Sequence, residues 1–171
     1  MSRISQNFHK EVEAGINKQI NKELASSYFH LSIAFHFDRD DVALENFQKY
    51  FAKLSQQKKD NADKCLKYMN ERGGRISLKD IPTPDNNLGT PHEVMKAVLA
   101  HEKVMNTYVL ELTALAEKHG DENFADFMED NFLETQVDRL KEVGGHVRNL
   151  ERAGTGLGEY MFDQETLGGD H

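Results

Sequence analysis

The sequence predicts an all-α fold, a four-helix bundle with one long crossover plus a short fifth C-terminal helix. Two observations carry this prediction. All three prolines, Pro82, Pro84 and Pro91, fall within one ten-residue window, so the stretches on either side lack the strongest helix breaker. Along both stretches apolar residues recur at spacings of three and four, the period of a helix that buries one face.

Glycines and turn residues divide the two stretches into separate helices. The first half breaks at Asp38-Arg39-Asp40-Asp41 and ends at Gly73-Gly74. The segment Thr90-Pro91-His92-Glu93 is a capping box with proline at the first helical position, and Gly120 ends the helix that it begins. We therefore predict long helices at 9–37, 44–72, 91–119 and 122–154, and a shorter amphipathic helix at 158–167. The pair Gly144-Gly145 predicts a kink in the fourth helix.

The connection 73–90 is too long for a simple hairpin. It has 18 residues and could extend to about 60 Å, whereas each long helix measures about 43 Å. This loop can therefore run the length of the bundle, so that the second and third helices are parallel. The other connections are short, which predicts antiparallel neighbours and one domain over 1–171.

Composition narrows the class of protein. The net charge of −8 argues against nucleic acid as a partner, and no apolar run is long enough for a membrane span. The single Cys65 cannot form an internal disulfide, and the polar N-terminus lacks the features of a signal peptide. A cytoplasmic protein with neither nucleic acid nor membrane as a partner is expected.

Polar residues interrupt the apolar stripe of every long helix near its middle. They are Glu23 in the first helix, Lys58 and Asn61 in the second, Glu102 in the third and Gln136 in the fourth. Midpoints of equal helices share one level in a bundle, so these side chains should meet in the core. Buried charges are unfavourable unless they are paired or coordinated. The cluster is therefore either a site or the remnant of one.

The residue types in this cluster disfavour a metal centre. Bundle di-iron sites use carboxylates together with Glu-x-x-His motifs, and no histidine of this chain has glutamate three residues before it. The second helix instead has Lys58-Lys59-Asp60-Asn61, and a lysine ammonium has no lone pair for a metal. With His30 from the first helix, the cluster holds two carboxylates, one amine, two amides and one imidazole. We expect Lys58 to neutralise Glu23 and Glu102.

The chain resembles a eukaryotic ferritin subunit, of a non-vertebrate kind, over about residues 6–168. The most specific strings are Phe37-Asp38-Arg39-Asp40-Asp41-Val42-Ala43-Leu44 and Arg72-Gly73-Gly74-Arg75-Ile76. Asp126-Phe127 with Glu129, and Gly158-Glu159-Tyr160, add to these. The resemblance implies a ferritin-like bundle whose subunits form a hollow cage of 24 chains, either of one kind or mixed with catalytic subunits.

The resemblance also assigns roles to the cluster. Glu23, Glu102 and Gln136 match positions of the ferroxidase centre of heavy-type ferritins. Lys58 stands in place of the bridging glutamate, Asn61 in place of the histidine ligand, and His30 in place of a tyrosine beside the ligands. This pattern is similar to light-type subunits, which lack the centre, so ferroxidase activity is expected to be lost or very weak.

Other acidic residues match positions that handle iron in the family. Asp126 and Glu129, one helical turn apart, match the acidic ring of the three-fold channels. Asp60 and Asp63 are the candidates for mineral nucleation, on a helix face that otherwise carries lysine and glutamine. The expected cargo is ferrous iron in transit and ferric mineral, with no organic cofactor. Two alternatives stay open: an active ferroxidase with an altered site, and a cage without an iron role.

Overall fold

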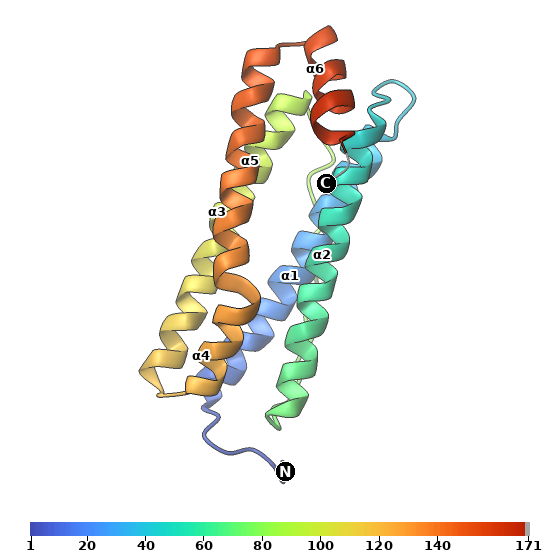
Figure 1. The fold of residues 1–171 in the computed structure, drawn as a ribbon. Coiled ribbons are helices and arrows are strands. Elements are labelled where there is room, and N and C mark those ends of the chain that lie inside the picture. Colours follow the sequence, from blue (N-terminus) through green and yellow to red (C-terminus); the bar gives the residue numbers. More distant parts are fainter. Residues whose placement is uncertain (170–171) are drawn as a thin grey trace.

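Long helices form the body of the molecule, and a short C-terminal element folds back against one end (Figure 1). The computed structural model describes residues 1–169, so residues 170 and 171 of the domain predicted over 1–171 lie outside the described residues. The elements, in chain order, are α1 (Lys10–Phe37), α2 (Glu45–Glu71), α3 (Pro91–Lys118), α4 (Glu122–Met128), the π-helical segment η1 (Glu129–Leu133), α5 (Glu134–Ala153), α6 (Leu157–Met161) and the π-helical segment η2 (Phe162–Leu167). The all-α fold class is confirmed.

Side-chain caps set the first residues of several helices. The capping box at α3 is formed, since Thr90 Oγ1 accepts from the Glu93 amide and the Glu93 carboxylate accepts from the Thr90 amide. Asp121 caps α4 through the amide of Phe124, at 3.0 Å. His9 caps α1 with its ring, because Nδ1 accepts from the amide of Glu11 at 3.0 Å. Such caps satisfy amides that have no partner within the helix.

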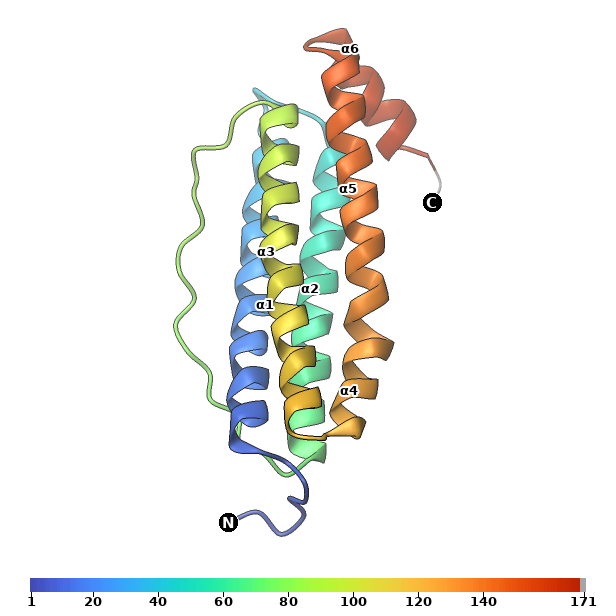
Figure 2. The ribbon, with the colours of Figure 1, turned by 90° about the vertical axis from the view of Figure 1, so that its left-hand side faces the viewer.

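The crossover 73–90 runs along the outside of α1 and α3, from one end of the bundle to the other (Figure 2). Asn17 of α1 holds its first part, since the Asn17 amide donates to the carbonyl of Arg75 and accepts from the amide of Ser77. The loop begins at Gly73, whose φ of +76° is open to glycine. Because the loop returns the chain to the far end, α3 runs parallel to α2.

The predicted fourth helix is not interrupted at Gly144 and Gly145, where we expected a kink, but at residues 129–133. The helix continues through Gly144 and Gly145 within α5. The interruption instead lies at η1, where five residues, 129–133, adopt π-helical hydrogen bonding between α4 and α5. A π segment inserts extra backbone into a turn and rotates the residues that follow. Here it adjusts the face that α5 presents to the bundle.

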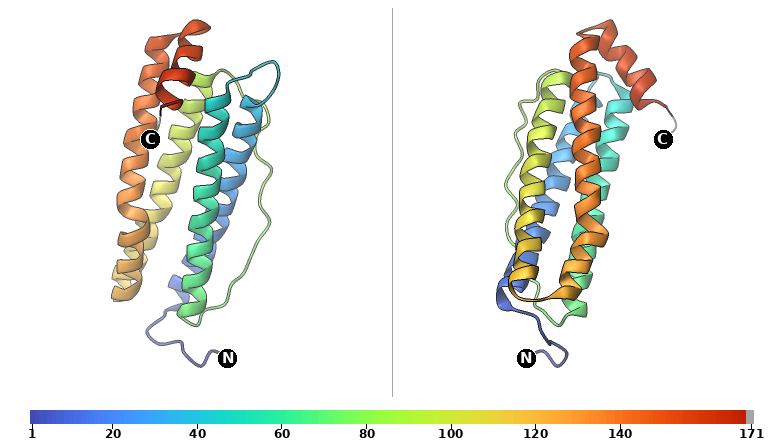
Figure 3. Two further views of the ribbon diagram at one scale, coloured as in Figure 1. Left: turned by 45° about the vertical axis from the view of Figure 1, so that its right-hand side comes forward. Right: turned by 60° about the vertical axis from the view of Figure 1, so that its left-hand side comes forward.

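The C-terminal element is fastened to the start of α2 (Figure 3). Asp163, buried in η2, accepts from the amide of Phe47 at 2.9 Å and from the side chain of Asn46 at 3.3 Å. Phe162 packs against Phe47, with ring centroids 5.5 Å apart. The N-cap residue of α2, Leu44, makes no side-chain cap bond. Asp163, although far away in the sequence, therefore provides the hydrogen-bond acceptor that the N-cap residue of α2 does not.

The apolar core divides into two clusters along the bundle. One contains Val12, Ile16 and Ile20 of α1 with residues of α2, α3, α4 and η1, and the other contains Ile33, Ala34 and Phe37 with residues near the opposite end. Cys65 is a buried free thiol in the first cluster, as expected of a core residue. Between the two clusters lies a layer of buried polar side chains. No helix among the described residues is both long and apolar enough to span a bilayer.

Candidate functional site at the middle of the bundle

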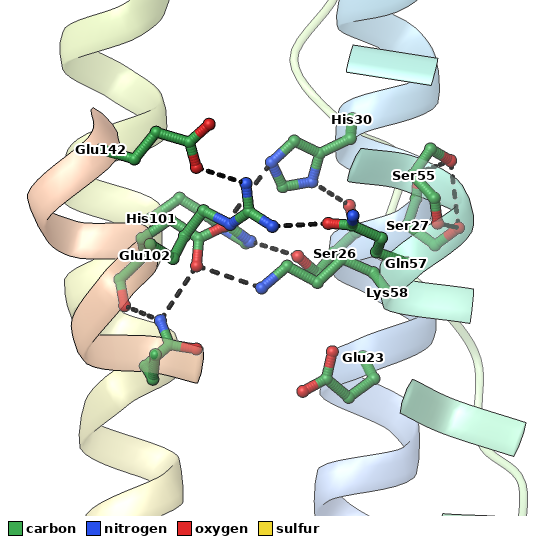
Figure 4. A network of polar contacts seen from close by, with 12 residues as sticks. Glu23, Ser26, Ser27, His30, Ser55, Gln57, Lys58, His101, Glu102 and Glu142 are labelled. Atoms are coloured by element: carbon green, nitrogen blue, oxygen red, sulfur yellow. Dashed lines mark hydrogen bonds and ion pairs between the residues drawn. The ribbon is translucent and has the colours of Figure 1, made fainter. Parts of the chain in front are cut away.

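A layer of polar side chains crosses the core between the two apolar clusters (Figure 4). The predicted residues Glu23, His30, Lys58, Glu102 and Gln136 are all buried in it, and Asn61 is half-buried beside it. We call these six residues the mid-bundle layer. All four long helical rods contribute to it, so the structure brings together the residues that interrupt the apolar stripes.

Glu102 is the centre of this layer. One of its carboxylate oxygens, Oε2, accepts from the Lys58 ammonium at 3.0 Å and from the Gln136 amide at 2.9 Å. The same Gln136 amide also donates to the Glu102 backbone carbonyl at 2.9 Å. Glu102 is fully buried and Lys58 is only 5% exposed, so this ion pair lies inside the protein. Burial alone would raise the pKa of Glu102, but the charge of Lys58 and the hydrogen bonds hold it below its usual value.

Glu23 has a different environment. Its carboxylate accepts from the amide of Gln19 at 2.9 Å and, at a longer 3.5 Å, from Asn61. Lys58 forms its ion pair with Glu102 and with no second carboxylate among the described residues, so it acts on Glu23 only through its charge and without direct contact. Burial raises the pKa of Glu23, and the more distant charge of Lys58 only partly opposes this.

His30 faces Glu102 without a hydrogen bond between them. Its Nδ1 lies 2.7 Å from the backbone carbonyl of Ser26 and must donate, because a carbonyl only accepts. Its Nε2 therefore carries a lone pair, which points toward Glu102 Oε1 at 3.7 Å. Both atoms are buried and have no hydrogen-bond partner among residues 1–169. Burial, reinforced by the charge of Lys58, lowers the pKa of His30 to about 3, so the ring is neutral at neutral pH.

A second histidine next to the layer escaped the sequence analysis. His101 Nε2 lies 2.7 Å from the hydroxyl of Ser26, and burial lowers the pKa of His101 to about 4. His101 is the residue directly before Glu102 in α3. Consecutive residues point in different directions around a helix, so His101 does not belong to the apolar stripe that Glu102 interrupts. The signal that could have found it is the i, i+4 pair of Ser26 and His30, which predicts a polar patch on α1 facing α3.

The donor set of the layer suits internal charge compensation better than cation binding. A divalent metal between Glu23 and Glu102 would have to displace the ammonium of Lys58, a cation that is already hydrogen-bonded there. Within residues 1–169, the only group of three carboxylate or imidazole ligand atoms lying within 4.8 Å of one another is His9, Glu11 and His119, far from the layer. A cavity of about 210 Å³ lies beside Lys58, between α2 and α5, with Asn61, Lys64 and Arg139 among its lining residues.

The other predicted residues lie on the surface, and Asp60 also lines the cavity beside Lys58. Asp126 of α4 and Glu129 of η1 are both exposed. Asp60 and Asp63 are exposed on α2. Asp60 accepts from the side chain of Gln56 at 2.9 Å, and Asp63 pairs with Lys59 at 2.6 Å. Asp126 and Glu129 make no ion pair with any of the described residues.

Comparison with known proteins identifies relatives along the whole chain. The family described as Ferritin-like domain matches residues 13–153. The chain is 50% identical over 168 residues to Soma ferritin of Lymnaea stagnalis, which covers 98% of this chain and 97% of the relative. It is 46% identical to Ferritin-1 heavy chain of Schistosoma mansoni over 171 residues, 99% of each chain. It is also 46% identical to Ferritin light chain, oocyte isoform, of Xenopus laevis over 173 residues, 99% of this chain and 98% of the relative. The heavy-chain and light-chain relatives match this chain equally well, so overall identity does not assign it to either type.

Proposed function

This chain belongs to the ferritin family of iron-storage proteins, and on that premise we propose that it is a storage subunit with little or no ferroxidase activity of its own. In this proposal residues 1–171 act as one domain, and 24 such chains, alone or mixed with catalytic ferritin subunits, enclose a cavity. Ferrous iron passes through acidic channels formed by Asp126 and Glu129, and ferric mineral is held inside. Asp60 and Asp63 are the proposed nucleation residues. The buried free thiol of Cys65 supports a reducing, cytoplasmic setting.

The observation that carries the loss of activity is the buried ion pair of Lys58 with Glu102. Its ammonium lies 3.0 Å from Glu102 Oε2, in the space where a cation bound by that carboxylate would lie. Asn61, on the next turn of α2, points an amide toward Glu23. Two positions that could complete a two-metal site therefore carry an amine and an amide. Neither group binds iron well.

The test is to convert both positions together. Lys58→Glu with Asn61→His should produce rapid oxidation of added ferrous iron, because the layer would then offer three carboxylates and, with His30, two imidazoles. The matched control is Lys67→Glu with Asn70→His, which makes the same changes at the same spacing on the exposed face of α2. Rapid oxidation by the first variant alone supports the proposal. If neither variant, although folded, gains activity, our assignment of the mid-bundle layer is wrong.

One observation favours a second candidate function, an altered ferroxidase site. His30 Nε2 and Glu102 Oε1 are two buried acceptors 3.7 Å apart, and no residue of the described chain donates to either. A water molecule or a single metal ion would satisfy both. Crystals soaked anaerobically in ferrous iron distinguish the two candidates. Anomalous iron density between these atoms would favour the altered site, whereas density for Lys58 and water alone favours the storage subunit.

A further inference from the structure

A second group of potential metal ligands lies at the end of the bundle where α1 begins and α3 ends (Figure 2). His9 is the N-cap residue of α1, Glu11 lies in the first turn of that helix, and His119 is the C-cap residue of α3. We call these three residues the His9–Glu11–His119 cluster. It belongs neither to the mid-bundle layer nor to the proposed channel and nucleation residues.

The three side chains already converge. Their ligand atoms all lie within 4.8 Å of one another. Glu11 Oε2 is 3.0 Å from His119 Nε2, close to the separation of two ligand atoms on one small metal ion. The rings of His9 and His119 stack with centroids 3.6 Å apart and planes inclined by 11°. Two helices that are distant in sequence therefore hold two imidazoles and a carboxylate together.

We propose that the His9–Glu11–His119 cluster binds one divalent transition-metal ion of the zinc and copper class. Two imidazole nitrogens and one carboxylate oxygen are the ligands that such ions prefer, and water completes the coordination. Calcium and magnesium, which prefer oxygen ligands only, are poor fits. The binding itself goes beyond the proposed storage function and does not depend on it.

The contacts that a metal must replace are weak and near solvent. The ion replaces the proton through which His119 Nε2 contacts Glu11. It takes the lone pair of His9 Nδ1 from the Glu11 amide, an exposed hydrogen bond whose loss water can compensate. The exposed ring of His9 must also turn out of its stack, because a metal lies in the plane of each imidazole that binds it.

The principal competitor is Lys118. Its ammonium lies 3.0 Å from the same Glu11 oxygen, with side chains 62% and 48% exposed, so this pair is weak. The hydrogen bonds from His119 and Lys118 lower the pKa of Glu11 to about 2. The C-terminal end of α3 also favours a cation at His119.

Electron paramagnetic resonance of bound Cu²⁺ tests this inference on the iron-free, assembled protein. At one equivalent per chain, the spectrum should contain nitrogen couplings from two imidazoles. His119→Gln and His9→Gln should each leave one imidazole and lower the copper affinity at least tenfold. His92→Gln, at the opposite end of α3, is the matched control and should leave both unchanged. A two-imidazole spectrum that persists in His119→Gln would overturn the proposal.

A gain of affinity provides a second, independent measurement. Lys118→Gln removes the competing ammonium and should raise the affinity for Cu²⁺ and Zn²⁺ severalfold, as measured by calorimetry. An unchanged affinity in this variant means that Glu11 does not bind the metal, which contradicts the proposed cluster. Because neither measurement involves iron or oxygen, their failure would leave the proposed storage function untouched.

Discussion

Glu23 and Glu102 are buried carboxylates of one layer, yet their pKa values move in opposite directions. Glu102 has an ammonium in contact and a lowered pKa, whereas Glu23 has only amide donors and a raised pKa. Glu102 therefore contributes stability above the pKa of an unfolded glutamate and loses it as the pH falls through the folded value. Glu23 has the reverse effect, because burial penalises its charged form as the pH rises through its folded pKa.

Replacing Glu23 with glutamine should therefore stabilise the protein at neutral pH. Glutamine keeps the shape and can still accept from Gln19, while the buried charge is gone. We expect a gain in the free energy of unfolding of about 1 kcal/mol at pH 7.5. The gain should fade toward about pH 3, below the pKa of an unfolded glutamate, where the carboxyl is neutral in both the folded and the unfolded chain. Guanidinium unfolding at the two pH values measures it.

The control for this prediction is Glu117→Gln, an exposed position on α3. Its unfolding midpoint should match that of the parent chain at both pH values. A destabilised Glu23→Gln variant at pH 7.5 would mean that the charge of Glu23 is needed by a partner, which contradicts our description of its environment.

Sequence patterns predicted the position of the mid-bundle layer better than its contacts. Stripe interruptions locate Glu23, Lys58, Glu102 and Gln136 because helical period and equal helix length fix their level. Which of the two carboxylates pairs with Lys58 depends on the length of the lysine side chain and on the hydrogen bond from Gln136 to Glu102. The helical period of the sequence does not predict either of these. His101 lies beside the stripe and was missed for the same reason.

Among the elements, α2 depends on a residue from the far end of the chain. Its own N-cap residue, Leu44, contributes no side-chain acceptor, and the buried carboxylate of Asp163 accepts the amide of Phe47 instead. This contact joins the C-terminal element to the bundle. It also illustrates a limit of local capping rules, which predicted α3 from Thr90 and Glu93 but contain no information about a cap 116 residues away.

Asp163→Ala should loosen both elements that this contact joins. The Phe47 amide would lose its acceptor, which costs about 1 kcal/mol or more. Hydrogen exchange should accelerate about fivefold or more in residues 157–167 and in the first turn of α2, with the middle of the bundle unchanged. Glu165→Ala, at an exposed position of the same segment, is the control. Equal exchange in the two variants would show that Asp163 does not fasten the C-terminal element.

The irregular turn at 129–133 was also beyond sequence reasoning. We expected Gly144 and Gly145 to disturb the fourth helix, but the helix continues through both. The π segment at η1 contains neither glycine nor proline. The π segment lies between Phe132, which is part of the apolar core, and Gln136, which donates to Glu102. We attribute the irregular turn to the packing of these two side chains rather than to local helix propensity.

At the scale of the whole molecule, the negative charge favours the uptake of cations. A cage of 24 chains with a net charge of −8 each would carry about −190, and such a field draws in cations at low salt. The exposed carboxylates of Asp126 and Glu129 would concentrate this field at the channels. Lys59 forms an ion pair with Asp63 and partly neutralises the exposed pair Asp60 and Asp63. We therefore expect this pair to act in mineral growth rather than in the admission of iron.

Two double variants should separate these roles. Asp126→Asn with Glu129→Gln should slow the admission of ferrous iron several-fold and weaken its dependence on ionic strength. Asp60→Asn with Asp63→Asn should leave admission unchanged and slow only the growth of ferric mineral after oxygen is supplied. Anaerobic protection of iron from an external chelator measures the first process. Equal effects of the two variants on admission would contradict the division of roles.

We propose that Lys58 and Asn61 disable the iron-oxidising centre in an otherwise intact ferritin bundle. The decisive experiment is to measure oxygen consumption after ferrous iron is added to the purified, assembled chain. We predict a rate close to that of the same solution without protein, since the Lys58 ammonium lies 3.0 Å from Glu102 Oε2, where a metal bound by that carboxylate would lie. Rapid consumption that saturates at two iron ions per chain would contradict it.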